Sequence, residues 1–154
     1  MATVDHVDLE RFMGDWYVIA NIPTFPERNA HNAIESYRLA EDGTVETTFS
    51  FRRGGFDGPE RVMRPRGYVR PDTGNAKWGM QFVWPIRADF RIVYLDEAYE
   101  RTIIGRQRRD FVWIMAREPA IAEPDLESLI RFVGELGYNT NRVQRVPQQI
   151  NGRE

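Results

Sequence analysis

The side chains best suited to catalysis are scarce in this sequence, and their spacing favours no catalytic arrangement. Cysteine is absent, which excludes disulfides, thiolate nucleophiles and cysteine-ligated metals. The imidazoles are His6, near the amino terminus, and His31, in a long connection. A hydrolytic site would require His31 to meet Ser36 or Ser50, and no metal-ligand spacing is present. We therefore expect no catalysis, no metal and no cofactor; a hydrolytic or haem-binding protein is the alternative from the enzyme class.

A buried charge is the second candidate for chemistry. Alternation along residues 33–40 turns Tyr37 and Leu39 toward the interior, and the same parity turns Glu35 inward. A carboxyl group there costs free energy unless it is paired or protonated. Arg53, inward by parity on the neighbouring strand, is its predicted partner. The pair is either a structural ion pair or a holder of a ligand's polar group.

Large apolar side chains that recur with period two define a candidate ligand site. Such a stripe is ordinary core in most proteins, but small inward residues leave space between the rings here, and a mostly apolar cavity with few polar groups is typical of a small-molecule site. These small residues are Ala20, Thr47, Gly67, Val69 and Thr102. The predicted ligand-binding set is Glu35, Tyr37, Phe49, Phe51, Arg53, Trp78, Met80, Phe82, Trp84, Phe90, Ile92, Tyr94, Ile104, Phe111, Trp113 and Met115.

The elements that must position these residues are short strands separated by turn residues. Pro65 weakens one of them, because proline has no backbone N–H to donate. Eight antiparallel strands without crossover helices favour an all-β, up-and-down barrel, which removes exposed edges and can enclose one small ligand. A flattened β-sandwich is the competing fold. The predicted strands cover residues 14–23, 33–40, 44–52, 61–69, 76–84, 90–95, 101–105 and 111–117.

The last third of the chain changes period. Apolar residues at three- and four-residue spacings predict one amphipathic α-helix over 123–137, with Pro124 in its first turn and Gly137 at its end. We expect this helix to cover the outer face of the last strand, where Val112 and Ile114 are also apolar. A short strand is predicted in 142–146, residues 147–154 are expected to fray, and residues 1–154 are interpreted as a single domain.

Charge excludes some partners and suggests others. The 154 residues carry 21 basic and 23 acidic side chains, a net charge of −2 that gives no reason to expect a nucleic-acid partner. Arginines concentrate in the loops predicted at the open end of the barrel, and they suit an amphiphile with an anionic head unless they only keep the rim soluble. A module that binds a partner protein through these loops remains open. The rim arginines are Arg28, Arg53, Arg87, Arg106, Arg108 and Arg109.

Three short motifs resemble the signatures of the lipocalin family. They are "GDWY" at residues 14–17, "YLDEAY" at 94–99 and "AREP" at 116–119, and they occur in the family's order. The resemblance is greatest to the group of bacterial outer-membrane lipocalins, plant temperature-induced lipocalins and apolipoprotein D, and it covers about residues 7 to 148. The second motif departs from the family's Thr-Asp-Tyr by placing Leu95 and Glu97 beside Asp96.

The resemblance implies a structural role for Gly14, Trp16, Asp96 and Arg117. Trp16 would close one end of the barrel beneath the Arg117 guanidinium, in a cation–π contact. It also implies a non-catalytic carrier of a fatty acid or lysophospholipid, acting in membrane lipid maintenance, as a monomer or weak homodimer. Association with a membrane surface is left open. Periplasmic or outer-membrane placement follows by analogy only, and the cytoplasm is the alternative, since the sequence shows no secretory signal and no cysteine to lipidate.

Overall fold

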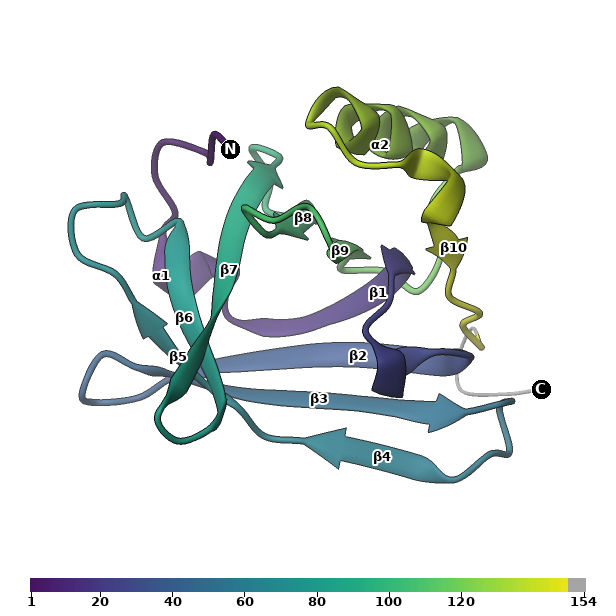
Figure 1. The fold of residues 1–154 in the computed structure, drawn as a ribbon, viewed down its shortest axis with the longest axis horizontal. Helices are drawn as coiled ribbons and strands as arrows, with labels where there is room; N and C mark the ends of the chain where they lie inside the picture. Colours follow the sequence, from purple (N-terminus) through teal and green to yellow (C-terminus); the bar gives the residue numbers. More distant parts are fainter. Residues whose placement is uncertain (150–154) are drawn as a thin grey trace.

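The strands of the computed structural model, which describes residues 1–149, form a closed antiparallel β-barrel (Figure 1). Closure arises because the first strand pairs with both the second and the ninth. This confirms the barrel and excludes the sandwich. The wall consists of β1 (Gly14–Ile22), β2 (Ala30–Leu39), β3 (Val45–Arg53), β4 (Glu60–Met63), β5 (Arg66–Val69), β6 (Lys77–Val83), β7 (Ile86–Leu95), β8 (Arg101–Gly105) and β9 (Val112–Ala116).

The predicted fourth strand is divided into β4 and β5 at Arg64 and Pro65. β4 pairs with β3 alone, whereas β5 pairs with both β3 and β6. Because proline cannot donate to a ladder, the wall separates here and β4 diverges from β6. The two halves together account for the fourth of the eight predicted strands, and the separation leaves Met63 and Pro65 beside the interior space.

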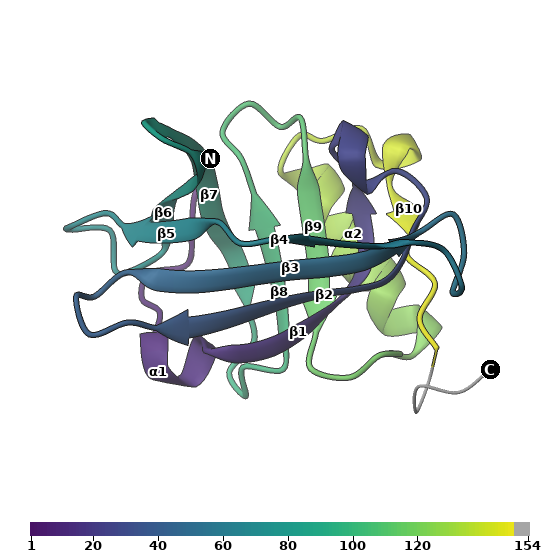
Figure 2. The same ribbon diagram turned by 90° about the horizontal axis from the view of Figure 1, so that it is seen from below.

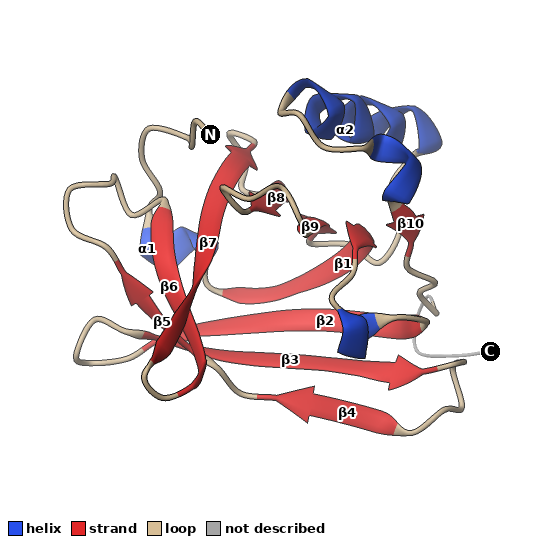
Figure 3. Cartoon of the chain, viewed as in Figure 1, coloured by secondary structure: helices blue, strands red, loops and turns tan. Residues whose placement is uncertain are grey.

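A single long helix, α2 (Glu123–Glu135), packs against the outside of the barrel (Figure 3). Pro124 occupies its first turn and Gly137, with φ of +105°, follows its end, as the sequence predicts. The helix buries one apolar face against the outward side chains of β1, β8 and β9. This outer layer contains Ile19, Ala20, Ile22, Val93, Ile103, Val112, Ile114, Ala116, Leu126, Leu129 and Val133.

The base of the barrel is closed by the amino-terminal segment, which the sequence pattern did not reveal. A one-turn helix, α1 (Leu9–Phe12), begins at Asp8, whose carboxylate accepts hydrogen bonds from the N–H groups of Glu10 and Arg11. Val7 and Phe12 are fully buried beneath the barrel. Figure 2 shows α1 lying under one end of the wall, beside the start of β1.

Two bulges move predicted interior residues to the outer face. The register of β1 shifts between Val18 and Ala20, and Ala20 belongs to the outer layer rather than to the interior. The register of β7 shifts between Ile92 and Tyr94, so the Tyr94 ring packs against Phe132 of α2 with ring centroids 5.5 Å apart. The assignments of Ala20 and Tyr94 to the interior are therefore wrong, because strict alternation does not survive a bulge.

The carboxyl-terminal segment is held against the wall. A short strand, β10 (Gln144–Arg145), forms within the predicted range and pairs with β1, a pairing that the sequence did not predict. A single-turn 3₁₀ helix, η2 (Thr140–Arg142), precedes β10, and another, η1 (Phe25–Glu27), lies between β1 and β2. Gln148 donates to the carbonyls of Val18 and Ala33, so residues 147–149 do not fray; the rest of that prediction lies outside the described residues. Within residues 1–149, neither α-helix combines the length and the apolar character that crossing a membrane requires.

Candidate functional site

The upper half of the barrel encloses an apolar cavity of about 290 Å³. Its wall comes from η1, β2, β3, β4, β6, β7 and β9 and from the connections that join them. Polar groups are few, as in most small-molecule sites. The lining residues are Thr24, Pro26, Glu27, Glu35, Thr47, Phe49, Met63, Pro65, Met80, Phe82, Ala88, Asp89, Phe90, Arg106, Phe111 and Trp113.

The lower half of the barrel is filled by side chains. Trp78 stacks on Phe90 with ring centroids 4.6 Å apart, and Tyr37 meets the edges of both rings. Phe12 contacts Trp16, Tyr37 and Trp78 from below. Gly67 stays small because an added Cβ would lie 3.2 Å from the Trp78 ring. The packed rings form a floor, and the space above them is available to a ligand.

The predicted ligand-binding residues divide between this cavity and its floor. Seven of them line the cavity, namely Glu35, Phe49, Met80, Phe82, Phe90, Phe111 and Trp113. Others are inward and buried but belong to the packed interior outside the lining: Tyr37, Phe51, Trp78, Ile92, Ile104 and Met115. Period-two alternation thus identifies the inward side chains, but it does not tell floor from cavity.

The end of the predicted fifth strand leaves the barrel. Trp84 is 80% exposed and does not line the cavity, so its assignment to the interior is wrong. The register of the β6–β7 hairpin shifts between Met80 and Val83, and its tip extends beyond the point where β5 begins to pair. Phe82 is intermediate in character, because it borders the cavity while remaining 56% exposed.

Glu35 lies inside the barrel, as parity predicts, but its partner is different. The Tyr37 hydroxyl donates to Glu35 Oε1 at 2.5 Å, and within residues 1–149 no ion pair joins Glu35 to Arg53. The predicted Glu35–Arg53 pair is therefore wrong. Burial raises the pKa of Glu35 to about 7, a rise that the Tyr37 hydrogen bond opposes and the charge of Glu27 reinforces.

Glu27 is a second buried carboxyl that the sequence pattern did not single out. It is only 4% exposed, and it accepts hydrogen bonds from Thr24, Asn21 and the Trp113 indole, the last at 2.8 Å. Burial raises its pKa, and these hydrogen bonds offset part of the rise. Because Glu27 lies in the loop with two prolines, no strand periodicity was available to reveal its inward direction.

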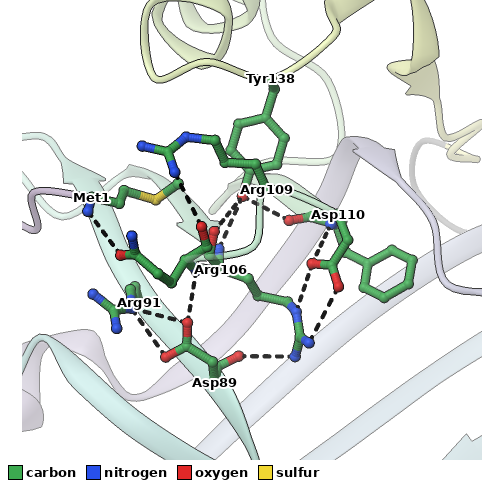
Figure 4. Close-up of polar contacts among 9 residues, drawn as sticks. Met1, Asp89, Arg91, Arg106, Arg109, Asp110 and Tyr138 are labelled. Carbon is green, nitrogen blue, oxygen red and sulfur yellow. Dashed lines mark hydrogen bonds and ion pairs between the residues drawn. The ribbon is translucent and has the colours of Figure 1, made fainter.

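The arginines predicted around the open end do not surround the cavity. Of the six, Arg106 alone belongs to the lining, and Figure 4 shows its guanidinium engaged by the Asp110 carboxylate and the Asp89 carbonyl. Arg87 covers the Tyr68 ring at 3.5 Å, and Arg109 donates to the Leu136 carbonyl at the end of α2. The rim therefore does not provide a ring of arginines that could bind an anionic head group.

The closed end has the arrangement that the resemblance implied. The Arg117 guanidinium lies 3.8 Å from the centroid of the Trp16 ring, and the Trp16 indole donates to the Phe12 carbonyl. Arg117 also donates to four backbone carbonyls, those of Arg11, Phe12, Asp15 and Tyr99. Gly14 has a φ of +99°, which favours glycine, and a Cβ added there would lie 3.5 Å from Arg117 Nη1.

The turn after β7 is built on Asp96. Its carboxylate oxygen Oδ1 accepts the N–H groups of Glu100 and Arg101, at 2.7 and 2.9 Å. Thus Asp96 organises the turn whose Tyr99 carbonyl receives Arg117.

The residues considered for hydrolysis are not directed at one another. His31 contacts the Asn29 carbonyl and the edge of the Phe56 ring, whereas the Ser36 hydroxyl donates to Asp15. In the part of the chain that the structure describes, no group of three or more histidine and carboxylate side chains is arranged to hold a metal ion.

A closed eight-stranded barrel with an outer helix, a stoppered base and an apolar cavity defines a small-ligand-binding barrel. A family model described as "Lipocalin-like domain" matches residues 7–148, and the chain belongs to the lipocalin family. It is 28% identical to temperature-induced lipocalin-1 of Arabidopsis thaliana, over 96% of this chain and 83% of that protein. The outer membrane lipoprotein Blc of Citrobacter freundii is 24% identical over the same shares.

Solved structures share the fold at lower identity. Insecticyanin from the tobacco hornworm Manduca sexta superposes with a TM-score of 0.72 at 16% identity, covering 94% of this chain and 82% of that one. Apocrustacyanin C2 gives a TM-score of 0.71 at 12% identity, covering 92% of this chain and 80% of that one. Lipocalins in general are non-enzymatic proteins that bind small hydrophobic ligands.

Proposed function

We propose that this protein is a non-catalytic carrier that binds a lipophile with a single apolar chain in its cavity. Fatty acids and lysophospholipids are the two ligand classes to test first, and membrane lipid maintenance is the setting in which such a carrier would act. The observation that carries the proposal is the cavity of about 290 Å³ above a packed aromatic floor.

The energetics support a chain of moderate length. Burying about ten methylenes at about 0.8 kcal/mol each contributes roughly 8 kcal/mol before association costs. This gross value corresponds to about micromolar affinity, so once loss of translational and conformational freedom is subtracted, ten methylenes alone bind more weakly than that, and a longer chain binds more tightly. The lining includes the aromatic rings of Phe49 and Phe90 and the flexible thioether of Met80. Such side chains accommodate an alkyl chain without requiring a specific polar contact.

Titration with a fluorescent fatty acid tests this proposal. We expect saturable binding of one ligand per chain and, after extraction of the purified protein, a lipid identified by mass spectrometry. Ala88→Trp should weaken binding at least about tenfold, because Ala88 lines the cavity and an indole there would occupy it. Glu127→Trp, on the exposed face of α2, is the matched control. Equal affinity in the two variants would show that the ligand binds elsewhere.

A specific observation favours action at a membrane surface. Val83, Trp84 and Ile86, at the tip of the β6–β7 hairpin, are each more than two-thirds exposed, and Phe82 connects them to the cavity lining. Exposed tryptophan and aliphatic side chains favour the interface of a lipid bilayer. A carrier docked by this tip would exchange its ligand with the bilayer through a continuous apolar path. Periplasmic or outer-membrane placement is part of this proposal, since several curated relatives are named outer membrane lipoproteins.

A further inference from the structure

Two carboxyl groups line the cavity without a positively charged partner. Glu35 is 8% exposed and Glu27 is 4% exposed. Within residues 1–149, no lysine, arginine or histidine forms an ion pair with either side chain. Arg106 is the guanidinium in the lining, and Asp110 holds it in a two-point contact. The cavity therefore contains more acid than base.

The two carboxyls differ in how far the protein satisfies them. Both Glu27 oxygens accept hydrogen bonds, from Trp113 and Asn21 on one side and from Thr24 on the other. Glu35 accepts one bond, from Tyr37 to Oε1, and within the described residues its Oε2 atom has no partner. Among the described residues no fully buried polar side-chain atom lacks a partner, so this oxygen opens onto the cavity that Glu35 lines, where a ligand can contact it.

The surroundings decide which ligand group fits. A ligand carboxylate near Glu35 would meet two acidic side chains and no free cation. An ammonium group would be attracted by both, and the aromatic side chains of Phe49, Phe90 and Trp113 belong to the same lining. We propose that Glu35 anchors the ammonium group of a lipophilic amine, whose apolar body fills the rest of the cavity.

This inference rests on the proposed function and names the polar chemistry that the cavity selects. Of the two ligand classes proposed above, it favours lysophospholipids that carry an ammonium group over free fatty acids. The titratable and charged groups around Glu35 are Tyr37 from β2, Glu27 from η1 and, in the remaining lining, Asp89 and Arg106. Asp89 is already engaged by Arg91 and Arg106 by Asp110 (Figure 4), which leaves Glu35 and Glu27 to respond to a ligand charge.

A ligand series with one chain and three head groups tests the proposal. Decylamine, decanol and decanoate would be titrated into the protein by calorimetry and by tryptophan emission at pH 8, where Glu35, with its pKa of about 7, is mostly ionised. We expect decylamine to bind about tenfold more tightly than decanol, and decanoate more weakly than either. Glu35→Gln should remove the advantage of the amine and leave decanol within about twofold of its original affinity; Glu41→Gln, in an exposed turn, is the charge-matched control.

Proton release gives an independent readout in the unaltered protein. Because Glu35 is mostly protonated at pH 6, binding of an ammonium should expel nearly one proton per ligand, whereas decanol should expel none. Calorimetry in two buffers of different ionisation enthalpy measures this number. Amine binding no tighter than alcohol binding, or without proton release, overturns the inference and leaves the carrier function standing. Failure of all three ligands to bind saturably overturns both.

Discussion

Glu35 is an ionisable side chain held inside the barrel, where its environment differs strongly from that of a surface carboxyl group. Its pKa of about 7 in the folded protein exceeds the ordinary value of 4.5, chiefly because burial disfavours the charged form. Between these two pH values the folded state retains a proton that the unfolded chain has lost. The free energy of unfolding therefore falls as pH rises from 4.5 to 7. The stabilisation that comes from the raised pKa of Glu35 is fully present below pH 4.5 and is lost above pH 7.

This pH dependence is the first prediction. Urea denaturation of the wild-type protein should lose about 3 kcal/mol of unfolding free energy between pH 4.5 and pH 8 because of Glu35 alone. Glu35→Gln should remove most of this loss, while a smaller slope of the same sign remains because the pKa of Glu27 is also raised. Parallel pH profiles for wild type and variant would mean that Glu35 is accessible to water.

The second prediction concerns Arg117 at the base. Arg117→Ala should lower the unfolding free energy by about 2 to 4 kcal/mol, since it removes the cation–π contact with Trp16 and leaves backbone carbonyls without their donor. Arg117→Lys should recover less than half of the unfolding free energy that Arg117→Ala loses, because an ammonium group cannot reach all of those carbonyls. Arg131→Ala, exposed on α2, should change stability by less than about 0.5 kcal/mol. A similar small change for Arg117→Ala would remove its structural role.

At the scale of elements, a substitution at the tip of the β6–β7 hairpin should weaken membrane binding without lowering the stability of the fold. Trp84 is 80% exposed, so Trp84→Ser should change the unfolding free energy by less than about 0.5 kcal/mol. The same change should reduce cosedimentation with vesicles of zwitterionic and anionic phospholipid at least about threefold, because interfacial tryptophan is lost. Tyr17→Ser, on a strand away from the hairpin, provides the comparison for loss of an aromatic ring. Unchanged vesicle binding would exclude the tip as the docking surface.

The elements also show how far sequence reasoning reaches. Alternation and turn residues predict the strands, and three- and four-residue spacing predicts the covering helix, because both depend on local spacing. Closure was predicted from the lack of crossover helices and from the need to remove exposed edges. Bulges at Val18 to Ala20 and Ile92 to Tyr94 could not be predicted, since the same apolar residues suit both faces of a wall that a helix also covers. Trp84 was misplaced because alternation carries no information on where a hairpin passes beyond its neighbour.

The candidate site was predictable to the same extent. Phe49, Met80, Phe90 and Trp113 lie in the cavity as their parity indicates. Glu27 escaped notice because its direction is set by tertiary hydrogen bonds to Trp113 and Asn21 rather than by a repeating pattern. The arginine-rich rim was misread for a related reason, since composition does not show that Asp110 already engages Arg106 or that Arg109 donates to a carbonyl at the end of α2.

For the molecule as a whole, one barrel carries two apolar layers with different tasks. The layer between the wall and α2 stabilises the fold, and the inner layer is filled below and empty above. Methionines lie both at the cavity and away from it. Met63 and Met80 line the cavity, whereas Met13 packs at the base and Met1 packs against the outer layer. A ligand bound inside the cavity should therefore change the signals of the methionines that line it and leave those of Met1 and Met13 unchanged.

Methyl NMR of the protein labelled at its methionines tests the cavity directly. On titration with decanol, the Met63 and Met80 methyl signals should shift and show cross-relaxation with the alkyl chain, because both side chains line the cavity. The Met1 and Met13 signals should stay within their uncertainty. Saturable binding that leaves Met63 and Met80 unchanged would contradict a ligand site inside the barrel.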